Sequence, residues 1–140
     1  SSQVVPSHQD DTMPVARDYR AAMDRYRDVL MPPDSLLYPG GKTEGSEYAP
    51  LPYSFVSFEG YLNAKMLVAI LQRMGADPKR ADLAQAALTM GEIDLGLGQR
   101  LSFGGAAARR QASDHVYYTV VQNGPFVPLE DGDWAAWRKP

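Results

Sequence analysis

The chain has 140 residues, 44% of them hydrophobic and 22% charged, the balance of an ordinary globular domain with a modest core. Its formal net charge of −3 argues against a nucleic-acid partner, because proteins that bind nucleic acids usually display a basic patch or stripe. The sequence contains no cysteine, which excludes disulfides and thiolate metal sites, and it has no apolar run long enough to span a bilayer.

The N-terminal part predicts a strand followed by a helix. Residues 3–6 are a short β-branched run closed by proline, typical of the end of a buried strand or of a crossover. Asp11 or Thr12 can cap the helix, with Pro14 in its first turn, where a missing amide does no harm. The apolar face of this helix recurs at three- and four-residue spacing and consists of Val15, Tyr19, Ala22, Met23, Tyr26 and Val29.

Residues 31–53 are rich in proline and glycine and predict a long irregular connection. After it, Ser54 or Ser57 is expected to open the strongest helix of the chain, which runs to about Met74. This helix is apolar around most of its girth, so we expect it to be largely buried. Gly75 is expected to end it.

The C-terminal part predicts a short helix and then β-structure. Asp77 and Pro78 are expected to start the short helix as its cap and first residue, and residues 94–98 form a turn-rich passage before a strand at 101–103. Residues 115–121 have high β-propensity. The Asn123-Gly124 pair that follows is a strong hairpin signal, with residues 126–127 as the returning strand.

The sequence shows no arrangement of residues that is typical of a catalytic site. His8 and His115 are the only histidines, and they lie far apart in the sequence without an ordered partner motif. Gly96 and Gly98 follow a predicted helix and have no third glycine or lysine in register, so a turn explains them better than a phosphate-binding loop. We therefore expect no catalytic residue, no metal site and no cofactor, and we predict that the protein is not an enzyme.

Four stretches of the sequence together resemble the closing part of type I periplasmic solute-binding proteins, the class that serves branched-chain amino acid ABC transporters. They are SQVVP (2–6) followed by VARDYRAA (15–22), then SFEGYLNAK (57–65), ADLAQAAL (81–88) leading to DLGL (94–97), and SDHVYYTVV (113–121) with NGPFVP (123–128). The second stretch is similar to the family's aromatic-glycine-tyrosine opening of a long helix. The loop at 31–53 is longer than the family's usual connection.

The resemblance implies an α/β fold, the C-terminal portion of a two-lobed type I periplasmic-binding-protein fold with helices packed on a sheet and a terminal β-hairpin. On this interpretation residues 1–100 hold the crossover strand and the helices of one lobe, with the irregular loop at 31–53. Residues 101–140 hold the terminal hairpin and tail of the other lobe. An N-terminal part of the same protein, with most of both sheets, is expected to precede this chain.

The implied function is solute binding for an ABC importer in the periplasm or another extracytoplasmic space, with an amino acid or a similar carboxylate as the solute and the transporter permease as a partner. Hinge closure between the lobes would bury the ligand. The hinge is expected near Val5 and Pro6, and again near Gly98 and Arg100.

Within this chain, the candidate ligand-binding residues are Ser57, Phe58, Glu59 and Tyr61, near the N-terminus of the long helix, where partial positive charge suits a carboxylate. Each also has a structural explanation: Ser57 as a helix cap, Phe58 and Tyr61 as core residues, and Glu59 as an acid of the first turn. Two other functions stay open, the extracytoplasmic sensor domain of a signalling receptor and a non-catalytic interaction domain.

Overall fold

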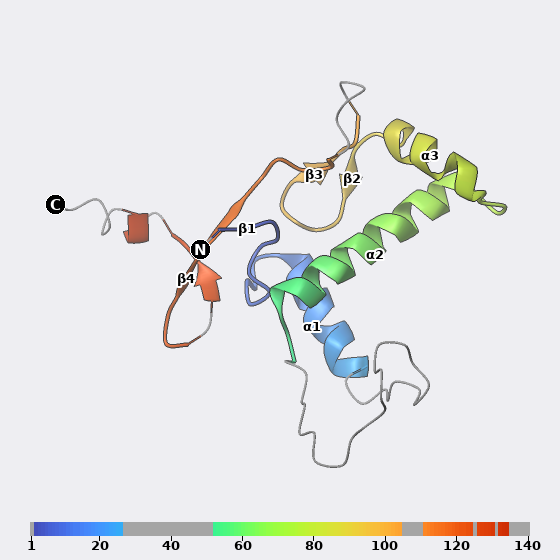
Figure 1. The fold of residues 1–140 in the computed structure, drawn as a ribbon. Coiled ribbons are helices and arrows are strands. Elements are labelled where there is room, and N and C mark those ends of the chain that lie inside the picture. Colours follow the sequence, from blue (N-terminus) through green and yellow to red (C-terminus); the bar gives the residue numbers. More distant parts are fainter. Residues whose placement is uncertain (1, 27–51, 105–110, 125, 131, 135–140) are drawn as a thin grey trace, which may run out of the picture.

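The computed structural model describes residues 2–26, 52–104, 111–124, 126–130 and 132–134. Helices and short strands share this part of the chain (Figure 1). The helical elements are α1 (Pro14–Tyr26), α2 (Phe55–Met74), the single 3₁₀ turn η1 (Arg80–Asp82) and α3 (Leu83–Thr89). The strands are β1 (Ser2–Gln3), β2 (Ile93–Asp94), β3 (Arg100–Leu101), β4 (Tyr117–Val121) and β5 (Phe126–Pro128).

The strands form two small antiparallel sheets. One has the order β1-β4-β5, with Gln3 opposite Tyr117 and Val120 opposite Val127. The other is the β2–β3 hairpin, in which Ile93 lies opposite Leu101. The first and the last two strands of the described chain therefore lie in one sheet at one side of the helices (Figure 1). The molecule is a mixed α/β fold, as the sequence predicts.

Helix α1 begins at Pro14, where proline's fixed φ suits the first helical position. The expected caps, Asp11 and Thr12, are wrong, because the carbonyl of Met13 takes the first helical amide, that of Ala16, at 3.1 Å. The carboxylate of Asp11 instead pairs with the guanidinium of Arg20. The predicted continuation of this helix to Val29 lies outside the described residues.

Helix α2 is capped by Ser54, whose hydroxyl accepts the backbone N–H of Ser57 at 3.1 Å. Gly75 follows its last turn with a φ of +87°, a conformation that favours glycine, and confirms the predicted end. The next helix starts later than Asp77 and Pro78, because Lys79 is still extended and helical geometry begins only in η1. Of the predicted loop at 31–53, only Pro52 and Tyr53 lie within the described residues.

The hydrophobic core lies between α1, α2 and the β2–β3 hairpin. Its buried side chains are Val5, Val15, Ala16, Tyr19, Phe58, Leu62, Ile93, Leu95, Leu97 and Leu101. The loop of the hairpin approaches α1 so closely that a Cβ on Gly96 would lie 3.2 Å from the backbone nitrogen of Val15.

The expected burial of α2 on most sides is wrong for the described chain. Only Phe58, Leu62 and Ile70 are buried, whereas Val56 is 80% exposed and Val68 is 51% exposed. The neighbouring elements α1, α3 and β2–β3 cover one stripe of the helix, and no described element covers the opposite face.

The terminal hairpin confirms the tight turn predicted from Asn123 and Gly124. Asn123 and Gly124 have φ angles of +53° and +105°, the left-handed pair that a tight two-residue turn between antiparallel strands requires. Strand β5 then pairs back along β4, and the amide of Leu129 extends the ladder by donating to the carbonyl of Tyr118 at 2.9 Å.

Candidate functional site

The start of α2 is joined to α1 by a network of hydroxyl groups. The phenol oxygen of Tyr19 lies 2.6 Å from the hydroxyl of Ser57 and accepts the backbone N–H of Ser54 at 3.0 Å. The hydroxyls of Ser54 and Ser57 lie 2.9 Å apart. Tyr19 is fully buried, so this network positions the first turn of α2 on α1.

The four candidate ligand-binding residues differ in how far solvent reaches them. Phe58 is completely buried, with its ring 4.7 Å from that of Tyr19, so no solute can touch it in this chain. The hydroxyl of Ser57 is engaged in the network just described. Glu59 is exposed and Tyr61 is half-buried, and these two are accessible to a ligand.

Tyr61 lies in a charged environment on the surface between α1 and α2. Burial raises the pKa of its phenol, and the Asp18 carboxylate raises it further. The ammonium group of Lys65 lies 5.8 Å from the centre of the Tyr61 ring and 3.6 Å from a carboxylate oxygen of Asp18. The phenol therefore stays protonated near neutral pH and can donate a hydrogen bond.

The expected first hinge, at Val5 and Pro6, is buried, and Val5 belongs to the core formed with α1 and α2. The next residue, Ser7, is also buried, and its hydroxyl donates to the carbonyl of Phe126 at 2.9 Å. The chain thus leaves β1 and enters the helical part while held against β5.

The expected second hinge, at Gly98 and Arg100, lies in the β2–β3 hairpin. Gly98 has a φ of +74° in the connecting loop, and Arg100 opens β3 and pairs with Glu92 at 3.1 Å. Between them, the side-chain amide of Gln99 donates to the Tyr117 hydroxyl at 2.9 Å. This turn is therefore in contact with β4, the strand that runs beside β1.

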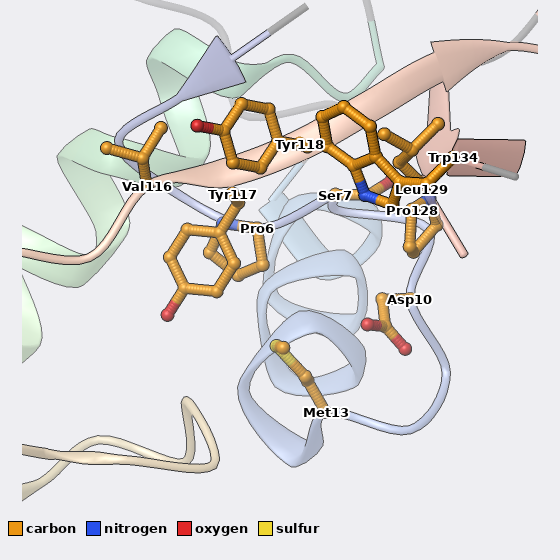
Figure 2. A pocket seen from close by; sticks show the side chains of 10 residues that line it. All are labelled: Pro6, Ser7, Asp10, Met13, Val116, Tyr117, Tyr118, Pro128, Leu129 and Trp134. Atoms are coloured by element: carbon orange, nitrogen blue, oxygen red, sulfur yellow. The ribbon is translucent and has the colours of Figure 1, made fainter. Parts of the chain in front are cut away.

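A cavity of about 230 Å³ lies between the segment that follows β1 and the strands β4 and β5. One wall comes from the loop before α1, and the other comes from β4, β5 and the residues after β5 (Figure 2). The residues that line it are Pro6, Ser7, Asp10, Met13, Val116, Tyr117, Tyr118, Pro128, Leu129 and Trp134. Ligand sites are usually about 300–1,000 Å³, so this one suits a small solute or a part of one.

Most of the cavity wall is apolar or aromatic, with few polar groups. Asp10 is its one charged residue among the described side chains, and one of its carboxylate oxygens accepts the backbone amide and the hydroxyl of Thr12. Burial raises the pKa of the Tyr117 phenol, an effect that the hydrogen bond from Gln99 partly offsets. The Trp134 ring packs edge-on against Tyr118, with centroids 5.3 Å apart. Such walls suit binding of a small, partly apolar molecule.

The sequence does not predict this cavity, because its residues come from separate stretches with no shared motif. Of the predicted hinge and ligand-binding residues, only Pro6 lines it. The pairing of β1 with β4 creates the cavity, and neither strand carries a signal that specifies the other.

Among the described residues, no three His, Asp or Glu side chains are grouped so that they could hold a metal ion. Within the same residues, none of the helices combines the length and the apolarity needed to cross a membrane.

No protein-family model matches the chain, and no curated protein sequence matches it. Among solved structures, the chain is similar to the crystal structure of a possible leucine/isoleucine/valine-binding protein from Rhodopirellula baltica SH 1, at 29% sequence identity and a TM-score of 0.67. The similarity covers 92% of this chain and 28% of that chain, so the present sequence spans little more than a quarter of its neighbour. The neighbour has the type I periplasmic-binding-protein fold, and the fold class expected from the sequence is thereby confirmed.

Proposed function

We propose that this chain is the C-terminal part of an extracytoplasmic binding protein for amino-acid-like solutes that serves an ABC importer. The observation that carries the proposal is the similarity to a possible leucine/isoleucine/valine-binding protein over 92% of the chain. The rest of such a protein would supply the greater part of the ligand site, because this chain spans 28% of the neighbour. The permease of the importer would be its protein partner.

The β1–β4 pairing supports a hinge role for the region around Val5 and Pro6. Strand β1 runs antiparallel to β4 just before these residues, the buried Ser7 just after them donates to β5, and Gln99 of the β2–β3 loop donates to Tyr117 of β4. In a two-lobed binding protein, a few residues at such crossings absorb the motion that closes the lobes on a ligand. The assignment of residues 1–100 to one lobe and 101–140 to the other is part of this proposal.

For the ligand, the cavity and the start of α2 are two separate candidate sites, because no residue of α2 lines the cavity. The Asp10 carboxylate suits the ammonium group of an amino acid, and the apolar wall around Met13 and Trp134 suits an aliphatic side chain. At α2, the protonated phenol of Tyr61 can donate a hydrogen bond to a carboxylate. Glu59 is the accessible acid beside it, and Ser57 orients this turn through Tyr19.

The test is a titration of the complete protein that contains this chain with leucine, isoleucine and valine, followed by calorimetry and thermal unfolding. Glutamate, lysine and glucose serve as comparison solutes. We expect saturable binding of at least one aliphatic amino acid, with a rise in melting temperature. The isolated 140-residue chain is expected to bind weakly or not at all. Failure of the complete protein to bind any amino acid would overturn the proposal.

The Asp10→Asn variant tests the ammonium site within the complete protein. Removing one charged partner costs about 1.5–3 kcal/mol, which weakens binding about tenfold to a hundredfold. Asp77→Asn is the matched control, because Asp77 is exposed in the turn after α2, and we expect it to leave the affinity unchanged. Equal affinities of the two variants would remove Asp10 from the site.

A second function, that of an interaction domain, is supported by the exposed apolar face of α2. Val56, Leu67 and Val68 are 80%, 45% and 51% exposed on this helix, more than a solvated surface helix normally carries. In a longer binding protein this face would be covered by the rest of the molecule. In an interaction domain it would be covered by a partner.

A further inference from the structure

His8 stands at the point where the buried segment of Val5 and Ser7 turns toward α1. Its ring centroid lies 5.6 Å from that of Phe55, 6.0 Å from that of Tyr53 and 6.4 Å from that of Tyr19. These three rings come from α1 and from the start of α2. The ring of His8 therefore holds its loop to both helices.

The environment of His8 favours the neutral imidazole. Its Nδ1 atom is buried and has no hydrogen-bond partner. Burial lowers the pKa of His8, and the nearby Arg20 guanidinium, which also donates to the His8 carbonyl, lowers it further. A proton on this ring would add a second positive charge beside Arg20 in a half-buried, largely aromatic setting.

The acidic groups near this ring are already committed to other partners. Asp11 pairs with Arg20 on the outer side of α1, and the Asp24 carboxylate accepts the hydroxyl of Tyr53 at 2.6 Å. The first turn of α2 contains no acidic residue, because Glu59, expected there from the sequence, follows that turn and is exposed. None of these groups accepts a hydrogen bond from the imidazole.

We propose that His8 is a proton-sensitive latch, whose neutral ring holds the loop of residues 5–11 against α1 and α2 and whose protonation releases that loop. Ser7 and Asp10 belong to this loop and line the cavity of Figure 2, so release changes the cavity shape and loosens the Ser7–Phe126 contact between the helical part and β5. The latch does not depend on which solute, if any, the protein binds.

The direction of the pH effect follows from the lowered pKa. The unfolded or released state takes up a proton near the ordinary histidine pKa of about 6.5, whereas the folded state takes it up only at lower pH. The stabilising effect of the latch is therefore complete above about pH 7 and declines as the pH falls through 6.5. A single proton changes the equilibrium constant at most about tenfold per pH unit.

The experiment measures the chain between pH 5 and 8 by urea unfolding, by NMR titration of the histidine rings, and by amide exchange at Gln9, whose N–H donates to Ser7. Carboxylates stay largely ionised in this window. His8→Phe keeps a ring in place without a titrating group, and His8→Gln serves if the phenylalanine variant folds poorly. His115→Gln is the matched control, because His115 is the other histidine and is exposed.

We expect the wild type and His115→Gln to lose stability as the pH falls from 7 to 5, with faster exchange at Gln9 before the helices open. In the His8 variants this pH dependence should disappear. The latch is overturned if the His8 variants keep the wild-type pH profile. A His8 ring that titrates at or above pH 6.5 in the folded chain would overturn it as well.

Discussion

At the scale of single residues, Tyr19 makes the contact on which the start of α2 depends. Its buried phenol accepts the Ser54 amide and lies within hydrogen-bond distance of the Ser57 hydroxyl, so one side chain of α1 fixes the cap of α2. The sequence marks Tyr19 only as one member of an apolar helical face. Its polar role appears once α1 and α2 are in contact.

We predict that Tyr19→Phe destabilises the chain by about 1–3 kcal/mol, because the partly buried Ser54 N–H and Ser57 hydroxyl lose a partner. Urea unfolding measures the change. The control is Tyr26→Phe, at a tyrosine of the same helix that is 59% exposed, for which we expect a change within about 0.5 kcal/mol. Equal stabilities of the two variants would contradict the role assigned to Tyr19.

At the scale of elements, the sequence predicts best what depends on neighbouring residues. The limits of α2 follow from Ser54 and Gly75, and the β4–β5 turn follows from Asn123 and Gly124, because caps and tight turns need particular residues at particular φ angles. Strand β2 is missed, since Ile93 and Asp94 form a strand only through their pairing with Arg100 and Leu101.

The site is less predictable than the elements, because long-range pairing builds it. Phe58 and Glu59 are neighbours in the same sequence motif, yet Phe58 is buried and Glu59 is accessible to solvent. The motif does not indicate which of the two a ligand can reach. The cavity joins Asp10 to Trp134 through β1–β4 pairing, which no local pattern specifies. Which side chains are buried, and which residues they contact, is decided only when the chain has folded.

Two glycines make a matched test of how the β2–β3 loop packs on α1. Gly96→Ala is expected to destabilise by about 1–3 kcal/mol, since Gly96 has a φ of +83° and a Cβ there would lie 3.2 Å from Val15. Gly60→Ala, in open space within α2, is expected to stabilise by about 0.5–1 kcal/mol. Thermal or urea unfolding measures both, and a neutral Gly96→Ala would mean that the loop is free to move away from α1.

At the scale of the whole molecule, the described part of the chain leaves apolar surface without a partner. The exposed face of α2 includes Leu67 and Val68, and β1, an outer strand of the sheet β1-β4-β5, has no described strand on its other edge. Both features favour association, through apolar contact or through strand pairing.

We therefore predict that the isolated 140-residue chain self-associates as its concentration rises, measured by sedimentation velocity. Replacing Leu67 and Val68 together by lysine should shift the distribution toward monomer. Asn63→Lys, at an exposed polar position of the same helix, adds charge without removing apolar area and should shift it less. A wild-type chain that stays monomeric at high concentration would contradict the prediction.

The hydrogen bond from Ser7 to Phe126 has a consequence for the order in which the chain folds. It joins residues 119 positions apart, whereas the Tyr19–Ser57 contact between the helices spans 38 positions. Closing the longer loop costs about 1 kcal/mol more in entropy, so the helical part is expected to assemble first and the sheet that joins β1 to β4 and β5 to close last. The segment that completes folding is then also the one from which the native chain most readily begins to open.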